Sequence, residues 1–210
     1  MRTILCYGDS NTWGFNAAGG GRFAAVVRWP GVLAGALGGE YRVIEEGLSG
    51  RTTMWDDPFA SGLNGQTYLG PCLRSHAPLD AVVLLLGTND LKAYFARSAT
   101  EIALGAGTLV EQMQRSGTGP DGRAPNVVLL APPPLGPLSG VVAELMAGGA
   151  EKSQRFGELY RWIATSYGCA FLDTAEHVAS GTTDGIHLDA AAHQRLGQAV
   201  AQLIRAMYPG

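Results

Sequence analysis

The stretch Thr-Ile-Leu-Cys-Tyr-Gly-Asp-Ser-Asn, residues 3–11, joins a short apolar run to a turn that carries a serine. The apolar run is typical of a buried strand. A serine at a strand-to-helix turn exposes its hydroxyl, and its own N–H can point at a developing oxyanion. A plain Gly-Asp-Ser turn is the alternative interpretation. The stretch therefore predicts the first strand of a sheet and, in Ser10, a candidate nucleophile.

Strand-like and helix-like segments alternate along the rest of the chain. This alternation predicts an α/β fold, a three-layer α/β/α sandwich with a five-stranded parallel sheet, flavodoxin-like in type. No internal repeat or long linker divides the sequence, so we expect one domain over residues 1–210. The expected strands are Thr3–Tyr7, Tyr41–Glu45, Ala81–Leu86, Asn126–Leu130 and Ala170–Asp173, and the expected helices are Trp29–Leu37, Thr67–His76, Ala99–Arg115, Ala143–Tyr167 and Asp189–Met207.

The composition restricts the possible partners. A net charge of −3 without runs of Lys or Arg argues against nucleic acid. The charged fraction of 16% leaves room for apolar surface, which suits a homo-oligomer. The uncharged stretch 124–143 contains five prolines and cannot form a continuous membrane-spanning helix, so no membrane partner is expected.

The N-terminus and the cysteines bear on the cellular compartment. The first residues reach a glycine too soon for the core of a signal peptide. Cys6, Cys72 and Cys169 are odd in number and lie far apart, which indicates free thiols. Cys6 and Cys169 fall in apolar runs, so these two thiols are expected to be buried. A cytoplasmic location fits these observations.

A second motif, Asp-Gly-Ile-His at residues 184–187, supplies partners for the serine. Serine is a poor nucleophile unless a histidine takes its proton and a carboxylate fixes the histidine tautomer. Three residues apart, Asp184 and His187 can turn toward one point on a loop that enters a helix. We therefore expect Ser10, His187 and Asp184 to act as nucleophile, base and orienting acid.

Other histidines compete for the role of the base. Asp173 and His177 form a second Asp/His pair, for which a structural hydrogen bond is the expected role. His193 is expected to be solvated on the last helix. The four histidines show no HExxH or paired Cys/His spacing, and no phosphate-binding glycine motif occurs, so neither a metal nor another cofactor is expected.

Two further blocks offer hydrogen-bond donors for an oxyanion. The loop 46–53 could present the backbone N–H of Gly50, with Gly47 as a rival because it also begins the loop after a strand. In Gly-Thr-Asn-Asp, residues 87–90, the Asn89 side chain can donate an amide N–H. Each block alone also fits a glycine loop or an Asx turn. Because both follow expected strands, they share one rim of the sheet with Ser10.

In their joint order, the blocks beginning at residues 8, 47, 87 and 184 resemble the SGNH (GDSL-type) hydrolase family over essentially the whole chain. The longer signatures are similar to its arylesterase/acyltransferase branch, which includes perhydrolases. The resemblance implies a serine esterase that hydrolyses short-chain aryl or acetyl esters through an acyl-serine. It implies Ser10, Gly50 and Asn89 as the oxyanion hole. Alternatives are an acyltransferase or perhydrolase passing the acyl group to an alcohol or peroxide, and, more remotely, an inactive binding module.

Apolar and aromatic residues beside these blocks are candidates for a small substrate pocket. Two segments with few charges, 16–27 and 56–66, are candidates for loops that form oligomer interfaces over the site. The expected partner is otherwise a small-molecule ester. The candidate pocket residues are Trp13, Trp55, Lys92, Phe95 and Ile186.

Overall fold

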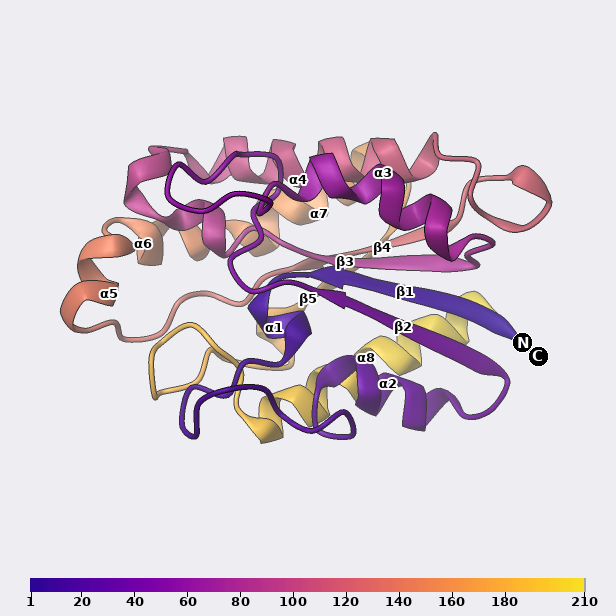
Figure 1. The fold of residues 1–210 in the computed structure, drawn as a ribbon, viewed down its shortest axis with the longest axis horizontal. Coiled ribbons are helices and arrows are strands. Elements are labelled where there is room, and N and C mark those ends of the chain that lie inside the picture. The colour runs from indigo at the N-terminus through magenta and orange to yellow at the C-terminus, as the bar shows by residue number, and fades with distance from the viewer. Residues whose placement is uncertain (210) are drawn as a thin grey trace.

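The computed structural model describes residues 1–209 and has a single parallel sheet between two layers of helices (Figure 1). The strand order is β2-β1-β3-β4-β5, which is the flavodoxin-like order. The predicted three-layer α/β/α sandwich with five parallel strands is therefore confirmed. The strands are β1 (Arg2–Gly8), β2 (Tyr41–Gly47), β3 (Ala81–Leu85), β4 (Asn126–Ala131) and β5 (Ala170–Asp173).

Side chains alternate along each strand and bury themselves under both helical layers. On β1, Leu5 and Tyr7 join the core on one face, whereas Ile4 and Cys6 join the core on the other. One layer consists of α3 (Gly65–His76), α4 (Ala99–Gln114) and α7 (Phe156–Tyr167), and the opposite layer of α2 (Trp29–Leu37) and α8 (Ala190–Met207) (Figure 1).

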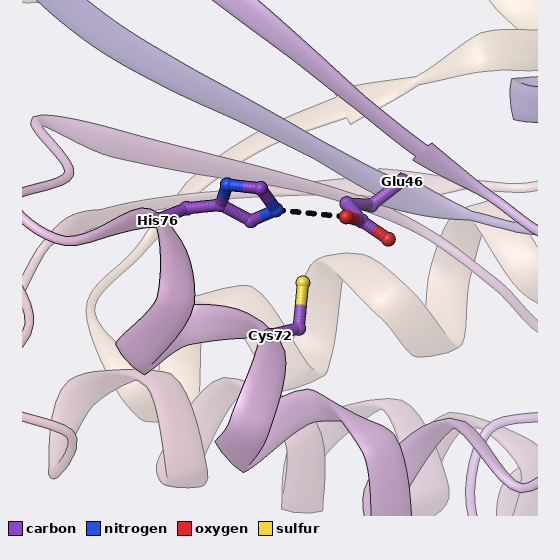
Figure 2. Close-up of side chains that lie close together, drawn as sticks. All are labelled: Glu46, Cys72 and His76. Atoms are coloured by element: carbon purple, nitrogen blue, oxygen red, sulfur yellow. Dashed lines mark hydrogen bonds and ion pairs between the residues drawn. The ribbon is translucent and has the colours of Figure 1, made fainter.

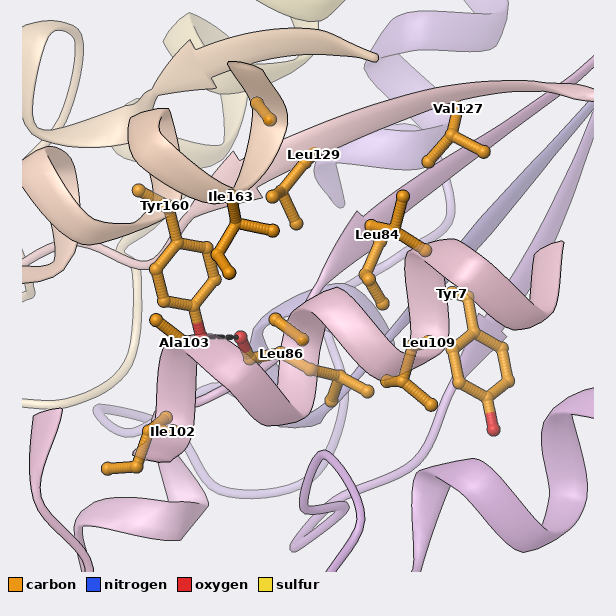
Figure 3. Close-up of a cluster of buried hydrophobic side chains, with 14 of the residues drawn as sticks. Tyr7, Leu84, Leu86, Ile102, Ala103, Leu109, Val127, Leu129, Tyr160 and Ile163 are labelled. Carbon is orange, nitrogen blue, oxygen red and sulfur yellow. Dashed lines mark hydrogen bonds between the residues drawn. The ribbon is translucent and has the colours of Figure 1, made fainter. Parts of the chain in front are cut away.

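The core beneath α4 and α7 extends to the rim of the sheet. Figure 3 shows Tyr160 of α7 with its ring among apolar side chains and its hydroxyl pointing at the end of β3. The hydroxyl donates a hydrogen bond of 2.7 Å to the carbonyl oxygen of Leu86. At Gly87 a Cβ would lie 2.1 Å from that hydroxyl oxygen, so the chain there requires glycine. This contact fixes the start of the Gly-Thr-Asn-Asp block.

The expected helix over Ala143–Tyr167 is wrong. The segment contains three helices, α5 (Gly140–Leu145), α6 (Gly149–Ser153) and α7. Gly148 has a φ of 72°, a left-handed conformation that a continuous α-helix cannot contain. The other expected helices agree to within two residues, and Asp189 caps α8 by accepting a hydrogen bond of 2.7 Å from the N–H of Ala192.

Short helices complete the chain at the ends of the strands. They are α1 (Ser10–Trp13) and four 3₁₀ turns, η1 (Asn89–Leu91), η2 (Ala93–Phe95), η3 (Pro120–Gly122) and η4 (Thr174–Glu176). The uncharged stretch 124–143 contains β4 and the proline-rich loop after it. Among the helices of residues 1–209, none is both long and apolar enough to cross a bilayer.

His193 was expected to be solvated, and this expectation is wrong. Its side chain is fully buried between α8 and α2, where Nδ1 accepts a hydrogen bond of 3.2 Å from the N–H of Trp29. Burial lowers the pKa of His193 to about 4, so the ring is neutral at pH 7. The three cysteines are free thiols: Cys6 and Cys72 are buried, and Cys169 is partly exposed.

Candidate active site

Ser10, His187 and Asp184 meet at the carboxyl end of β1. The Ser10 Oγ atom lies 2.9 Å from His187 Nε2, and His187 Nδ1 lies 2.6 Å from Asp184 Oδ2. With the Nδ1 proton donated to the carboxylate, the lone pair on Nε2 faces the serine hydroxyl. This is the arrangement in which an imidazole can take the hydroxyl proton.

The serine is placed by a tight turn between β1 and α1. Gly8 ends the strand, and a Cβ there would lie 2.0 Å from Thr12 Oγ1 and 2.7 Å from the Leu85 carbonyl oxygen. Because Gly8 has no side chain, α1 can pack directly on the end of the strand. Asp9 caps α1 by accepting a hydrogen bond of 2.9 Å from the N–H of Asn11. Ser10 is thereby held as the first residue of α1.

The loop that carries the histidine is organised by Asp184. Its Oδ1 atom accepts hydrogen bonds of 2.9 Å from the N–H groups of Ile186 and His187. Burial acts to raise the pKa of Asp184, but the His187 ring and these two N–H groups outweigh it, so the pKa is lowered and the carboxylate stays ionised. The ring of Phe15 packs on His187 with 4.5 Å between centroids. The imidazole is therefore held at its edge and on its face.

Two backbone donors are free beside the serine. Within residues 1–209, the N–H groups of Ser10 and Gly50 make no hydrogen bond to another residue. Gly50 has a φ of 86°, which favours glycine. Gly47, the rival donor, ends β2 against α1, where a Cβ would lie 2.1 Å from the Trp13 nitrogen. Close packing accounts for glycine at position 47, which leaves Gly50 as the better candidate donor.

The Asn89 side chain is bound to the loop that carries Gly50. Its Nδ2 atom donates a hydrogen bond of 3.1 Å to the carbonyl oxygen of Arg51. An amide nitrogen carries two hydrogens, so one is left for a ligand. Asp90 accepts a hydrogen bond of 3.1 Å from the N–H of Thr53 on the same loop. The second and third blocks thus form one connected unit.

Arg51 ties this unit to β1. Its guanidinium donates to the carbonyl oxygen of Gly8 at 2.9 Å and to that of Glu46, and lies 4.2 Å from the centroid of the Tyr7 ring. Arg51, Thr53 and Asp90 were not predicted as functional. Arg51 and Thr53 lie inside the quoted glycine loop, and Asp90 directly follows Asn89, so proximity to the motifs is the one sequence signal that could have identified them.

Two carboxyl groups are buried beneath the site. Burial, reinforced by the charge of Asp90, raises the pKa of Asp9 to about 7. Burial also raises the pKa of Asp90 to about 6, although Thr53 hydrogen bonds lower it. Asp9 Oδ2 has no hydrogen-bond partner among the described residues. Ionised Asp9 therefore costs free energy in the folded state.

The predicted pocket residues lie around the rim, each with a structural partner. The guanidinium of Arg97 lies 3.9 Å from the Trp55 ring centroid, and Lys92 Nζ lies 3.1 Å from Asp57. Phe95 is buried beside Tyr94, with 4.6 Å between the ring centroids.

The remaining two predicted pocket residues flank the triad. The guanidinium of Arg22 lies 5.1 Å from the Trp13 ring centroid. Ile186 precedes His187, and its side chain is partly buried against the core. That these five residues contact a substrate stays a prediction. A cavity of about 40 Å³ borders His187 directly and is lined in part by Phe23 and Leu188.

The rival pair does not reach the serine. Asp173 caps η4 by accepting a hydrogen bond of 3.0 Å from the N–H of Ala175. His177 is exposed, and its backbone carbonyl accepts a hydrogen bond from Arg195. Asp173 therefore has a structural role at the end of β5, whereas the expected hydrogen bond between the two side chains is not formed among residues 1–209.

Among residues 1–209, Glu46, Cys72 and His76 form the one group that could hold a metal ion (Figure 2). Cys72 and His76 lie on one side of α3 and point at Glu46 on β2, with the three candidate ligand atoms within 4.8 Å of one another. His76 Nε2 and Glu46 Oε1 are 2.8 Å apart, which is a hydrogen-bond distance. Burial raises the pKa of Cys72 to about 12, so its thiol is protonated. The hydrogen bond between His76 and Glu46 thus ties α3 to β2.

A cavity of about 590 Å³ opens beside this cluster. Glu46, Arg51 and Tyr68 contribute to its wall, whereas Ser10, His187 and Asp184 do not. The hydroxyl, imidazole and carboxylate at the end of β1 therefore lie outside this cavity, although Arg51 joins its wall to the loop that carries Gly50.

The chain is similar to known proteins over almost its whole length. A model of the GDSL-like lipase/acylhydrolase family matches residues 6–195. The structure of an M. smegmatis aryl esterase is 43% identical, with a TM-score of 0.94 and coverage of 98% of this chain and 99% of that one. A carbohydrate acetylesterase from Sinorhizobium meliloti is 42% identical, with a TM-score of 0.96 and coverage of 99% and 100%.

A further structural match extends the same set. A putative arylesterase from Agrobacterium tumefaciens is 37% identical, with a TM-score of 0.89 and coverage of 98% of this chain and 99% of that one. No curated protein sequence matches the chain. These three structures thus cover 98–99% of this chain, and each is named as an esterase.

Proposed function

The chain belongs to the GDSL-like lipase/acylhydrolase family, and we propose that Ser10, His187 and Asp184 are its catalytic triad. The protein is a carboxylic-ester hydrolase, as the family match and its esterase neighbours show. The observation that carries the assignment of the triad is the unbroken hydrogen-bond path from Ser10 Oγ through His187 to Asp184.

In the proposed reaction, Ser10 Oγ attacks the ester carbonyl carbon while His187 Nε2 takes the hydroxyl proton. Asp184 stays ionised and stabilises the imidazolium. The carbonyl oxygen becomes an oxyanion that accepts hydrogen bonds from the N–H groups of Ser10 and Gly50 and from Asn89. Collapse of the tetrahedral intermediate breaks the ester C–O bond, and His187 protonates the leaving alkoxide. Water then attacks the carbonyl carbon of the acyl-serine while His187 takes its proton. Collapse of this second intermediate breaks the bond to Ser10 Oγ, which regains a proton from His187, and releases the carboxylic acid.

We propose short acyl esters, aryl or acetyl, as substrates. Two structural neighbours are named an aryl esterase and a carbohydrate acetylesterase. The Phe15 ring packed on the His187 imidazole supports a short acyl group, because it fills space beside the base. Hydrolysis of p-nitrophenyl esters from acetyl to octanoyl, with and without added ethanol, tests this assignment. Acetyl should be fastest, and an ethyl ester as the main product would instead indicate an acyltransferase.

We also propose a homo-oligomer in a reducing compartment such as the cytoplasm, with residues 1–210 as one domain. The two segments with few charges each expose an apolar side chain, Val26 at 78% and Phe59 at 79%. Free cysteines support the reducing compartment. Light scattering during size-exclusion chromatography tests the oligomer, because a mass near 22.0 kDa would mean a monomer.

A further inference from the structure

Asn11, the residue after Ser10, bonds to the backbone on both sides of His187. Its Oδ1 atom accepts a hydrogen bond of 2.9 Å from the N–H of Leu188, and its Nδ2 atom donates one of 3.4 Å to the carbonyl oxygen of Ile186. These partners are more than 170 residues away along the chain. One side chain thus joins the helix of the nucleophile to the loop of the base.

The loop has few other ties to that helix. Its remaining backbone bonds are internal, such as Gly181 N–H to the carbonyl of His187, or run to the proline-rich loop at Gly136. Across the described chain, the hydrogen bonds from α1 to residues 181–188 come from Ser10 and Asn11. Without Asn11, the bond between Ser10 and His187 would be the single hydrogen bond that holds the two elements together.

Asn11 is itself well fixed. Its side chain is buried, with 2% of its surface exposed, and its own N–H is held by Asp9. Water cannot easily replace its two hydrogen bonds at such a site, so their loss leaves backbone groups unsatisfied. A primary amide also offers an acceptor and a donor in one plane, which matches the N–H of Leu188 and the carbonyl of Ile186.

We propose that Asn11 is a positioning residue that keeps His187 Nε2 at hydrogen-bonding distance from Ser10 Oγ before substrate binds. The inference rests on the proposed triad. Proton transfer in the first step depends on this distance, and a displacement of about 1 Å can lower a rate by about 10²-fold. The Asn11 side chain hydrogen-bonds to the backbone of Ile186 and Leu188, and not to the reacting atoms or the oxyanion donors, so its loss should change kcat and leave KM nearly unchanged.

The experiment compares Asn11→Ala and Asn11→Asp with a matched control, Tyr208→Phe. The Tyr208 hydroxyl also links distant segments, donating to the carbonyl of Asp80 at 2.7 Å and accepting from Asn126 at 2.8 Å. Both partners lie at the amino ends of strands, at the opposite end of the sheet from Ser10. Steady-state kinetics with p-nitrophenyl acetate are measured well below each variant's Tm, together with the rate of fluorophosphonate labelling.

We expect Asn11→Ala to lower kcat and the labelling rate by about 10- to 100-fold, with KM within about twofold of the wild type. Tyr208→Phe should lower Tm and keep kcat. A protonated aspartic acid can reproduce both bonds of Asn11, whereas an ionised one cannot donate to Ile186. The kcat of Asn11→Asp relative to wild type at the same pH should therefore fall as pH rises and the introduced carboxyl group ionises.

A kcat for Asn11→Ala within about threefold of wild type would overturn the inference. So would an equal loss of kcat in Tyr208→Phe, since it would reflect stability alone. Activity of Ser10→Ala distinguishes a wrong assignment of Asn11 from a wrong assignment of the triad. If Ser10→Ala is inactive while Asn11→Ala is unimpaired, the triad stands and the positioning role falls. If Ser10→Ala remains active, the triad itself is wrong.

Discussion

Asn89 and Arg51 are joined by a hydrogen bond of 3.1 Å, from the side-chain amide of one to the backbone carbonyl of the other. The bond orients the amide of Asn89 and at the same time fixes the loop on which Gly50 precedes Arg51. Two of the three proposed oxyanion donors are therefore held in a fixed relation before substrate binds. Such preorganisation is the main way in which an oxyanion hole lowers a barrier.

Asn89→Ala should lower kcat by about 10²–10³-fold with little change in KM, because the amide is used mainly in the transition state. Steady-state kinetics with a short-chain ester measure this. If KM rises and kcat holds, Asn89 binds the ground state and does not belong to the oxyanion hole.

Ser10→Ala and His187→Ala should each abolish ester hydrolysis, because the members of a triad act as a unit. The fold should survive, since Ser10 loses one oxygen atom and His187 lies on a loop. His177→Ala is the control and should stay fully active, since His177 is exposed and bonds through its backbone. Retention of more than about a tenth of the wild-type rate in either triad variant would contradict the assignment.

Asp9→Asn should stabilise the folded protein more at pH 8 than at pH 5. Burial raises the folded-state pKa of Asp9 to about 7, against an unfolded value of about 3.9. Between these values the folded state binds more protons, so wild-type stability falls as pH rises to about 7. Asparagine has no such dependence.

The measurement for Asp9→Asn is the difference in Tm between variant and wild type across this pH range. We expect the difference to grow by several degrees, equivalent to at least about 1–2 kcal/mol. A difference that stays constant with pH would show that the folded and unfolded states hold the Asp9 proton equally, and hence that burial does not raise the pKa of Asp9.

The value of kcat/KM should fall as the acyl chain of the ester lengthens, from acetyl or butyryl to octanoyl. Each methylene that fits an apolar pocket contributes about 0.8 kcal/mol, so an open pocket would reverse the order. The Phe15 ring fills space beside the His187 imidazole, which leaves less room for a long acyl chain. Values of kcat/KM for the series of p-nitrophenyl esters test this prediction. A higher kcat/KM for the octanoyl ester would show that short acyl esters are not the preferred substrates.

His76→Ala should lower Tm and leave ester hydrolysis unchanged, because it breaks the 2.8 Å bond to Glu46 outside the triad. Incubation with a chelator should also leave the rate unchanged, since the proposed base is an imidazole. If chelation abolishes activity and Zn²⁺ restores it, the Glu46–Cys72–His76 cluster binds a functional metal.

Much of this architecture could be predicted from local sequence patterns. The strands are short apolar runs bounded by glycine or polar residues, and Asp189 signals the start of α8 because its side chain can cap a helix. The division of residues 140–167 into three helices could not be predicted, because helical period alone does not show that Gly148 adopts a left-handed conformation. The buried state of His193 depends on α2, a segment about 160 residues away.

The candidate site also has residues that could be predicted from the sequence and residues that could not. Short motifs contain Ser10, Asn89 and the Asp184/His187 pair, and their residue types and spacing predict the chemistry. The parts contributed by Arg51, Asp90 and Asn11 depend on contacts between blocks that are distant in sequence. Arginine stacked on a core tyrosine and asparagine bonded to a remote loop have no local signature, so their roles appear only in the folded chain.

The central claim is that ester cleavage passes through an acyl group on Ser10. Its most direct test is peptide mass spectrometry of the protein after reaction with a fluorophosphonate, with residual esterase activity followed in parallel. We predict one adduct per chain, on the peptide that contains Ser10, formed in proportion to the loss of activity and absent from Ser10→Ala. An adduct on another residue that tracks inactivation, or full activity after complete labelling of Ser10, would contradict the account.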